Sequence, residues 1–134
     1  MSIITVIGSG LMGSAMSVPA ADNGHQVRLL GTPLDREIIR SLQEKGLHPT
    51  LPCTLPDGIR AFQFEEVREA LEGADMVICG VSSFGVDWFA DEALPLLPGG
   101  VPVLNVTKGL LGYPDGSLET FPHFFARKRP DLSF

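Results

Sequence analysis

The sequence predicts an α/β fold: a doubly wound parallel sheet with helices on both faces, in a single domain spanning residues 1–134. Short apolar runs alternate with helix-forming stretches almost without exception, and a glycine-rich turn joins the first run to the first helix. The runs are continuously apolar, which is typical of strands that are covered on both faces. Alternation of this kind builds right-handed βαβ units and therefore a parallel sheet.

The predicted elements follow one another in a regular order. Strands are expected at residues 3–7, 25–30, 59–62, 75–81 and 101–107, and residues 131–134 are expected to begin another. Helices are expected at residues 11–23, 33–46, 64–73, 84–97 and 117–129. Glycines at or just after the ends of the first three helices are stop signals, and Pro122 is expected to interrupt the last helix. The proline-rich residues 47–58 predict an irregular connection.

Composition argues against several classes of protein. An apolar fraction of 44% suffices for a core, and a net charge of −6 argues against a broad surface for nucleic acid or anionic membranes. No apolar run approaches the ~18 residues of a membrane span, and the first residues lack the basic start of a signal peptide. Cys53 and Cys79 form no disulfide framework, and Cys79 falls within an apolar strand. We therefore expect a reduced, buried thiol in a cytoplasmic protein, and we predict no metal site.

The first turn, "IGSGLMG", carries glycines in G-x-G-x-x-G spacing between a strand and a helix. Gly8 permits a tight turn, Gly10 lets backbone amides approach a pyrophosphate, and Gly13 lets the helix pack closely on the strand. The helix N-terminus adds unpaired N–H groups for the anion. The pattern predicts a Rossmann-type domain that binds NAD or NADP; the alternative is a glycine-rich turn without a ligand. The predicted cofactor-binding residues of this turn are Gly8, Ser9, Gly10, Leu11, Met12 and Gly13.

The end of the second strand bears on cofactor preference. Dinucleotide-binding domains for NAD usually carry an acidic residue there, which accepts a hydrogen bond from the ribose 2′-hydroxyl. Here the position is Gly31 or Thr32, and the nearest acid, Asp35, falls in the first turn of the next helix. Thr32 can donate a hydrogen bond and Arg36 can reach a 2′-phosphate, so the sequence favours NADP(H). Arg36 is equally compatible with a solvated helix position.

Two further strand ends are expected at the same crevice, because ligands of such sheets bind outside the carboxyl ends of the strands. Gly80, Val81 and Ser82 follow the fourth strand and are predicted to lie near the cofactor, although Ser82 could instead cap the next helix. Lys108 follows the fifth strand, where its ammonium can pair with an oxyanion or a phosphate. The alternative is a lysine at the rim with no role.

Four segments carry a family resemblance. "VIGSGLMGSAMSVPAADNGHQVRLLGT", the His48-Pro49 dipeptide, "GADMVICGVSS" and "VTKGL" occur in this order. Together they resemble the N-terminal domain of NAD(P)-dependent glycerol-3-phosphate dehydrogenase, especially its archaeal-type branch. The resemblance implies that Lys108 is a catalytic residue that contacts both the cofactor and the substrate phosphoryl-glycerol.

The chain also departs from the family pattern. Leu11-Met12 replaces a frequent Ser-Trp, Thr32 a frequent arginine, and Ser82 a frequent proline. The family carries a second, all-helical domain that supplies the general-base lysine and most substrate ligands. Nothing in residues 1–134 matches that domain, so we expect this chain to be a fragment that is inactive alone.

The resemblance therefore implies an oxidoreductase that interconverts sn-glycerol 3-phosphate and dihydroxyacetone phosphate. The partner expected for the chain is this small-molecule substrate, with no nucleic acid and no membrane span. The sequence leaves open whether the full-length enzyme forms a homodimer. Alternatives are a stand-alone nucleotide-binding module without catalysis and a ketopantoate-type reductase. His48 could approach the adenine side of the cofactor, but we expect a histidine exposed on a surface loop.

Overall fold

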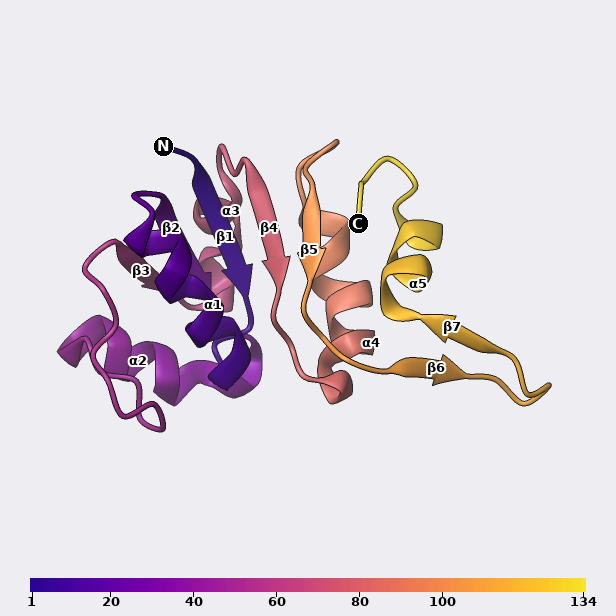
Figure 1. Ribbon diagram of the computed structural model, residues 1–134, viewed down its shortest axis with the longest axis horizontal. Coiled ribbons are helices and arrows are strands. Elements are labelled where there is room, and N and C mark those ends of the chain that lie inside the picture. Colours follow the sequence, from indigo (N-terminus) through magenta and orange to yellow (C-terminus); the bar gives the residue numbers. More distant parts are fainter.

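A parallel five-stranded sheet forms the centre of the computed structural model, which describes residues 1–134 (Figure 1). The strand order is β3-β2-β1-β4-β5. The strands are β1 (Ile3–Ile7), β2 (Gln26–Leu30), β3 (Ile59–Phe62), β4 (Met76–Cys79) and β5 (Val103–Asn105). The order of the strands reverses between β1 and β4, so a crevice is expected outside the carboxyl ends of these two strands. The predicted fold class is confirmed.

Helices cover both faces of the sheet. The α-helices are α1 (Leu11–Asp22), α2 (Arg36–Lys45), α3 (Val67–Leu71), α4 (Val86–Trp88) and α5 (Phe121–Lys128). Single turns of 3₁₀ helix are η1 (Pro33–Asp35), η2 (Phe64–Glu66), η3 (Ser83–Gly85) and η5 (Leu94–Leu96), and η4 (Phe89–Ala93) is a π-helical turn. None of these helices combines the length and apolar character that crossing a bilayer requires.

Alternate residues of the strands enter two separate cores. Val6 and Leu29 pack in the smaller core, against side chains of α1 and α2. Ile7 and Leu30, their chain neighbours, pack in the larger core with side chains of α3, α4 and α5. The central strands are therefore buried on both faces, which explains why their sequences are continuously apolar.

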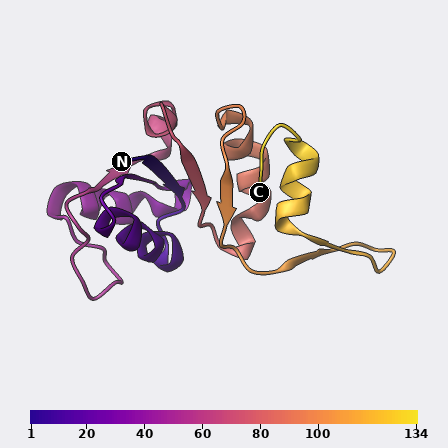
Figure 2. The same ribbon diagram turned by 45° about the horizontal axis from the view of Figure 1, so that its top comes forward.

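The predicted helix over residues 117–129 is wrong in its first part. Residues Leu110–Gly112 (β6) and Leu118–Thr120 (β7) form an antiparallel hairpin that projects from the body of the protein (Figures 1 and 2). Helix α5 begins only at Phe121, because the Thr120 side chain accepts a hydrogen bond from the His123 amide at 3.3 Å. Pro122 lies in the first turn of α5, where its missing N–H costs nothing, so it starts the helix rather than interrupting it.

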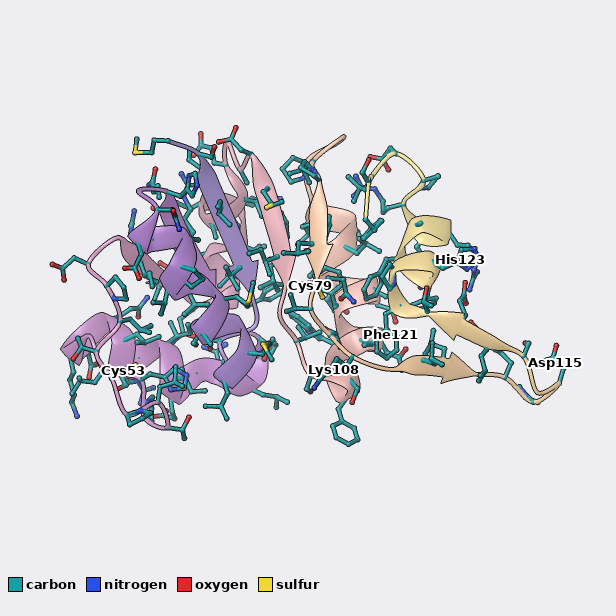
Figure 3. The ribbon with its side chains drawn as sticks, in the orientation of Figure 1. Cys53, Cys79, Lys108, Asp115, Phe121 and His123 are labelled. Carbon is teal, nitrogen blue, oxygen red and sulfur yellow. The ribbon has the colours of Figure 1, made fainter.

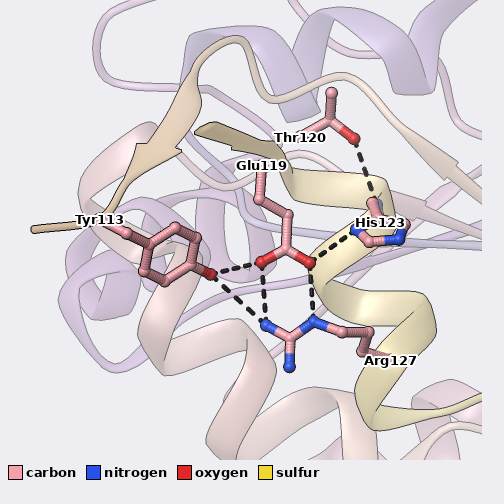
Figure 4. A network of polar contacts seen from close by, with 5 residues as sticks. All are labelled: Tyr113, Glu119, Thr120, His123 and Arg127. Atoms are coloured by element: carbon pink, nitrogen blue, oxygen red, sulfur yellow. Dashed lines mark hydrogen bonds and ion pairs between the residues drawn. The ribbon is translucent and has the colours of Figure 1, made fainter. Parts of the chain in front are cut away.

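A network around Glu119 joins the hairpin to α5 (Figure 4). The Arg127 guanidinium donates to both Glu119 carboxylate oxygens, at 2.7 and 2.9 Å, and Tyr113 and His123 complete the network. Hydrogen bonds from Arg127, followed by that from Tyr113, lower the pKa of Glu119 to about 2. Because the pKa lies below the ordinary carboxyl value of 4.5, the network contributes stability at neutral pH and loses it progressively as the pH falls from about 4.5 to about 2.

Residues 83–96 are helical throughout, but they do not form the single regular α-helix that was predicted over residues 84–97. A turn of 3₁₀ helix, the short α4, a π-helical turn and a second 3₁₀ turn follow one another. Pro95 lies in the last of these turns and cannot donate the amide hydrogen bond that a regular helix needs there. The expected strand over 131–134 is present only as a bridge, in which the Val103 amide donates to Ser133 O at 2.8 Å.

Both cysteines are free thiols, as expected. Cys79 is fully buried in β4, whereas Cys53 is exposed in the loop after α2 (Figure 3). Burial raises the pKa of the Cys79 thiol to about 11, so it stays protonated and unreactive at neutral pH.

Candidate cofactor-binding crevice

Gly8 and Gly13 are required by the fold of the turn itself. Gly8 has φ +103°, and a Cβ placed there would lie 2.9 Å from the backbone of Gly80. A Cβ on Gly13 would lie 1.8 Å from Gly8 O. The close approach of α1, β1 and β4 therefore leaves no room for side chains at these positions.

Gly10 differs from both, because nothing in the fold requires it. Its φ is −65°, and a Cβ there would meet no atom within 4 Å. The backbone amides of residues 10–13 donate no hydrogen bond within the chain. They lie at the N-terminus of α1, where the helix dipole favours an anion. This bare, unsatisfied surface is what a bound pyrophosphate needs.

Asp35 lies closer to the glycine turn than the sequence suggests. Its Oδ2 accepts hydrogen bonds from the Thr32 amide at 2.8 Å and from the Ser9 amide at 3.1 Å. Thr32 and Asp35 form a capping box around η1, which turns the carboxylate back toward the end of β2. A carboxylate therefore stands at the end of β2 although the strand-end position itself carries none, and this weakens the argument for NADP(H).

The Arg36 guanidinium already has a partner within the chain. It forms an ion pair with Glu65, and both side chains are more than half exposed. This contact favours the alternative of a solvated helix residue, and the predicted contact with a 2′-phosphate gains no support from the geometry.

Two small hollows adjoin at the end of β4. One, of about 230 Å³, is lined by residues that follow β1, β2 and β4, including Gly10, Thr32, Asp35 and Gly80. The other, of about 210 Å³, is lined by residues including Met12, Thr107 and Lys108. Val81 and Ser82 line both hollows, so the two lie side by side along the carboxyl edge of the sheet.

Two further predicted cofactor-binding residues, Ser82 and Leu11, differ in their surroundings. Ser82 occupies the N-cap position of η3, as the capping alternative expects, but its side chain makes no capping hydrogen bond, so its hydroxyl has no partner within the chain. Leu11 is exposed and lines neither hollow.

Lys108 is an exposed cation in the second hollow (Figure 3). Its ammonium makes no ion pair and no hydrogen bond within the chain, so its charge is available to a ligand. The preceding residue fixes its place, because Thr107 Oγ1 donates to Val81 O at 2.7 Å and ties the end of β5 to the end of β4. Gly109 has φ +138°, and a Cβ there would lie 2.9 Å from the Phe121 ring, so close packing under the hairpin requires this glycine.

The largest hollow of the molecule lies elsewhere. It measures about 580 Å³ and is open, and α3, Leu96 and Pro98 line it at the amino ends of β4 and β5. Neither a glycine turn nor the N-terminus of a long helix faces it. The two smaller hollows therefore form the better candidate for a dinucleotide site, despite their size.

His48 is the residue that sequence reasoning misplaced most clearly. It is 4% exposed and lies within hydrogen-bond distance of Ser9 in the glycine turn, so the prediction of an exposed loop histidine is wrong. One signal was available in the sequence: the proline-rich loop of residues 47–58 carries His48. A loop of this length is expected to pack back against the body of the protein, and it brings His48 to Ser9.

Comparisons with known proteins agree with this geometry. Residues 3–127 match the family model described as NAD-dependent glycerol-3-phosphate dehydrogenase N-terminus. The NADP(+)-dependent glycerol-3-phosphate dehydrogenase of Archaeoglobus fulgidus is 40% identical over 130 residues, which cover 97% of this chain and 38% of the relative. The glycerol-3-phosphate dehydrogenase [NAD(P)+] of Bacillus pumilus is 35% identical over 112 residues, 82% of this chain and 31% of the relative.

A solved structure shows the same fold. The glycerol-3-phosphate dehydrogenase of Coxiella burnetii superposes with a TM-score of 0.82 at 23% identity, over 98% of this chain and 38% of that one. This chain thus spans little more than a third of the length of the relatives that it matches. By its family match and by its identity to these relatives, the chain belongs to the NAD-dependent glycerol-3-phosphate dehydrogenase family, of which it corresponds to the N-terminal part.

Proposed function

We propose that residues 1–134 are the NAD(P)-binding domain of a glycerol-3-phosphate dehydrogenase. The full-length protein would interconvert sn-glycerol 3-phosphate and dihydroxyacetone phosphate. One observation supports this best: an anion site of free amides and an unpaired lysine lie in adjoining hollows that share Val81 and Ser82. The names of the relatives point to the same substrate and cofactor pair.

The residues of the crevice fit a dinucleotide. Gly10 presents backbone without a side chain, and the amides of residues 10–13 have no partner within the chain. The Ser9 hydroxyl is buried and also has no partner, which is unusual in a folded protein and fits a site completed by a ligand. We assign the pyrophosphate to this turn, the adenosine ribose to the hollow beside Thr32 and Asp35, and the reacting end to the hollow beside Lys108.

Each residue has a separate role in the proposed reaction. A bound nicotinamide supplies or accepts the hydride. Lys108 holds the anionic substrate, pairing its ammonium with the phosphate or with the oxygen at the reacting carbon, where negative charge develops on reduction. Thr107 keeps Lys108 in place through its hydrogen bond to Val81 O. The general base and the remaining substrate ligands are assigned to the part of the protein beyond Phe134.

An activity assay tests the proposal and its division into domains. The full-length protein should oxidise NADH or NADPH when dihydroxyacetone phosphate is added, with 2-ketopantoate as the comparison substrate. Residues 1–134 alone should bind NAD(P)H and show no turnover, because proximity and acid–base contributions are both lost. Turnover by residues 1–134 would contradict the division. Cofactor binding without turnover by the full-length protein would favour a stand-alone nucleotide-binding module.

The position of Asp35 gives a prediction about cofactor preference. A carboxylate in the ribose hollow repels a 2′-phosphate more than a 2′-hydroxyl, whereas an asparagine keeps an oxygen for the Ser9 and Thr32 amides. Asp35→Asn should therefore raise the affinity for NADPH relative to NADH by about 3- to 10-fold, the size of one screened charge pair.

Fluorescence titrations of both nucleotides against the two proteins measure this ratio. Glu37→Gln, which removes an exposed charge from the first turn of α2, is the matched control and should leave the ratio unchanged. An unchanged ratio in Asp35→Asn would mean that the 2′ position lies away from this carboxylate.

A further inference from the structure

The proposed function leaves a buried histidine unused. His48 belongs to the irregular loop after α2, yet it is 4% exposed. Its Nε2 lies 2.9 Å from Ser9 O, and its Nδ1 lies 3.2 Å from the amides of Thr50 and Leu51. Every nitrogen of the imidazole is thus engaged, and one of them is engaged with the glycine turn.

The partners of the ring assign its tautomer. Nδ1 faces two backbone N–H donors, so it is the acceptor, and the ring proton resides on Nε2. His48 therefore donates its Nε2–H to the Ser9 carbonyl.

Three side chains from three segments hold the backbone of Ser9. Besides His48, Ser14 Oγ in α1 donates to Ser9 O at 2.9 Å. Asp35 in η1 accepts from the Ser9 amide at 3.1 Å. Both backbone polar groups of Ser9 are thus held by side chains, whereas most backbone groups of the turn are not.

Fixing the Ser9 carbonyl also fixes the Gly10 amide. The two belong to the same trans peptide, in which C=O and N–H point in opposite directions. Because the carbonyl points at the buried His48 and Ser14, the Gly10 N–H points away from them, and it has no partner within the chain. No side chain at Gly10 restrains the peptide sterically, so hydrogen bonds must hold it.

We propose that His48 is a positioning residue of the cofactor site. It holds the Ser9–Gly10 peptide with its N–H, rather than its carbonyl oxygen, directed at the anion. A reversed peptide would present a partial negative charge to the pyrophosphate and weaken binding. The loop of residues 47–58 is thereby part of the cofactor site, although it does not line either hollow. This inference rests on the proposed function of the glycine turn.

Substitution by asparagine or by glutamine distinguishes the contribution of Nδ1 from that of Nε2. Asparagine places an oxygen near the position of Nδ1 and cannot reach Ser9, whereas glutamine places an N–H donor near the position of Nε2. In the full-length protein, His48→Asn should raise the dissociation constant and the KM for NAD(P)H about tenfold, the effect of one lost hydrogen bond. Its kcat at saturating cofactor should be retained. His48→Gln should restore binding to within about twofold of wild type.

Two serines of α1 provide a test that does not depend on His48 variants being folded. Ser14→Ala removes the second donor to Ser9 O, whereas Ser17→Ala removes a buried hydroxyl that binds Gly13 O at 3.0 Å. Ser14→Ala should weaken NAD(P)H binding, and Ser17→Ala should not, at similar losses in thermal midpoint.

The outcomes separate this inference from the proposed function. If wild-type protein binds no NAD(P)H, the proposed function fails and the inference with it. If the wild-type protein binds NAD(P)H, and His48→Asn and Ser14→Ala bind it with wild-type affinity, only the positioning role is wrong. The same conclusion holds if His48→Asn and His48→Gln lose binding equally, in proportion to their loss of thermal stability.

Discussion

A valine in place of Gly10 is expected to raise the dissociation constant for NAD(P)H about 100-fold and to leave the thermal midpoint almost unchanged. The fold tolerates the substitution, because φ at Gly10 is −65° and a Cβ there meets no atom within 4 Å. The cofactor does not tolerate it, because a branched side chain occupies the space through which phosphate reaches the amides of residues 10–13. A 100-fold change corresponds to about 2.8 kcal/mol, the size of one or two hydrogen bonds to a charged group.

Gly13, another glycine of the motif, provides a control variant in which the substitution affects folding rather than phosphate binding. A Cβ on Gly13 would lie 1.8 Å from Gly8 O, so Gly13→Ala should lower the thermal midpoint strongly and lose binding only through unfolding. Calorimetry and NAD(P)H fluorescence titration on both variants distinguish the two effects. Binding of NAD(P)H by folded Gly10→Val at wild-type affinity would show that the pyrophosphate lies elsewhere.

The same glycines show how much of the fold follows from the sequence. Continuous apolar runs, glycines at strand ends and stop signals after helices are local features, and they predicted the alternation of strands and helices and the parallel sheet correctly. The hairpin of β6 and β7 was missed because its strands are three residues long and exposed in large part. Its register depends on pairing between the two strands and on the contacts of Glu119 with α5, which no local pattern encodes.

The geometry of the glycine turn was predictable, because it depends on the backbone of its own residues, whereas its role in cofactor binding stays a prediction. Gly8, Gly10 and Gly13 take the positions that the spacing of the motif requires. Asp35 and His48 were misplaced because their side chains cross to the glycine turn from segments 26 and 39 residues away in the sequence. Such contacts depend on how the loops after β2 and α2 fold back, and a single sequence carries little information about that.

Lys108→Met in the full-length protein is expected to lower kcat/KM about 100-fold or more while the thermal midpoint stays within error of wild type. The ammonium of Lys108 is exposed and has no ion pair or hydrogen bond within the chain, so its removal costs the fold nothing. Methionine retains most of the aliphatic stem, and the tie from Thr107 to Val81 O is untouched. Removal of one donor to a developing oxyanion typically costs about 10²–10³ in kcat, and the Lys108 ammonium is proposed as such a donor.

Lys45→Met makes the same chemical change at the C-terminus of α2, away from the crevice, and should leave kcat/KM unchanged. Steady-state kinetics with dihydroxyacetone phosphate and NAD(P)H give kcat/KM, and calorimetry gives the midpoint. Separate NAD(P)H titration shows whether the loss lies in cofactor binding or in a later step. Because salt screens the attraction between the exposed Lys108 ammonium and an anionic substrate, rising salt should narrow the gap in kcat/KM between wild type and Lys108→Met. Full activity of Lys108→Met with a lowered thermal midpoint would instead show that Lys108 is a structural residue. The proposed role of its ammonium in substrate binding would then be wrong.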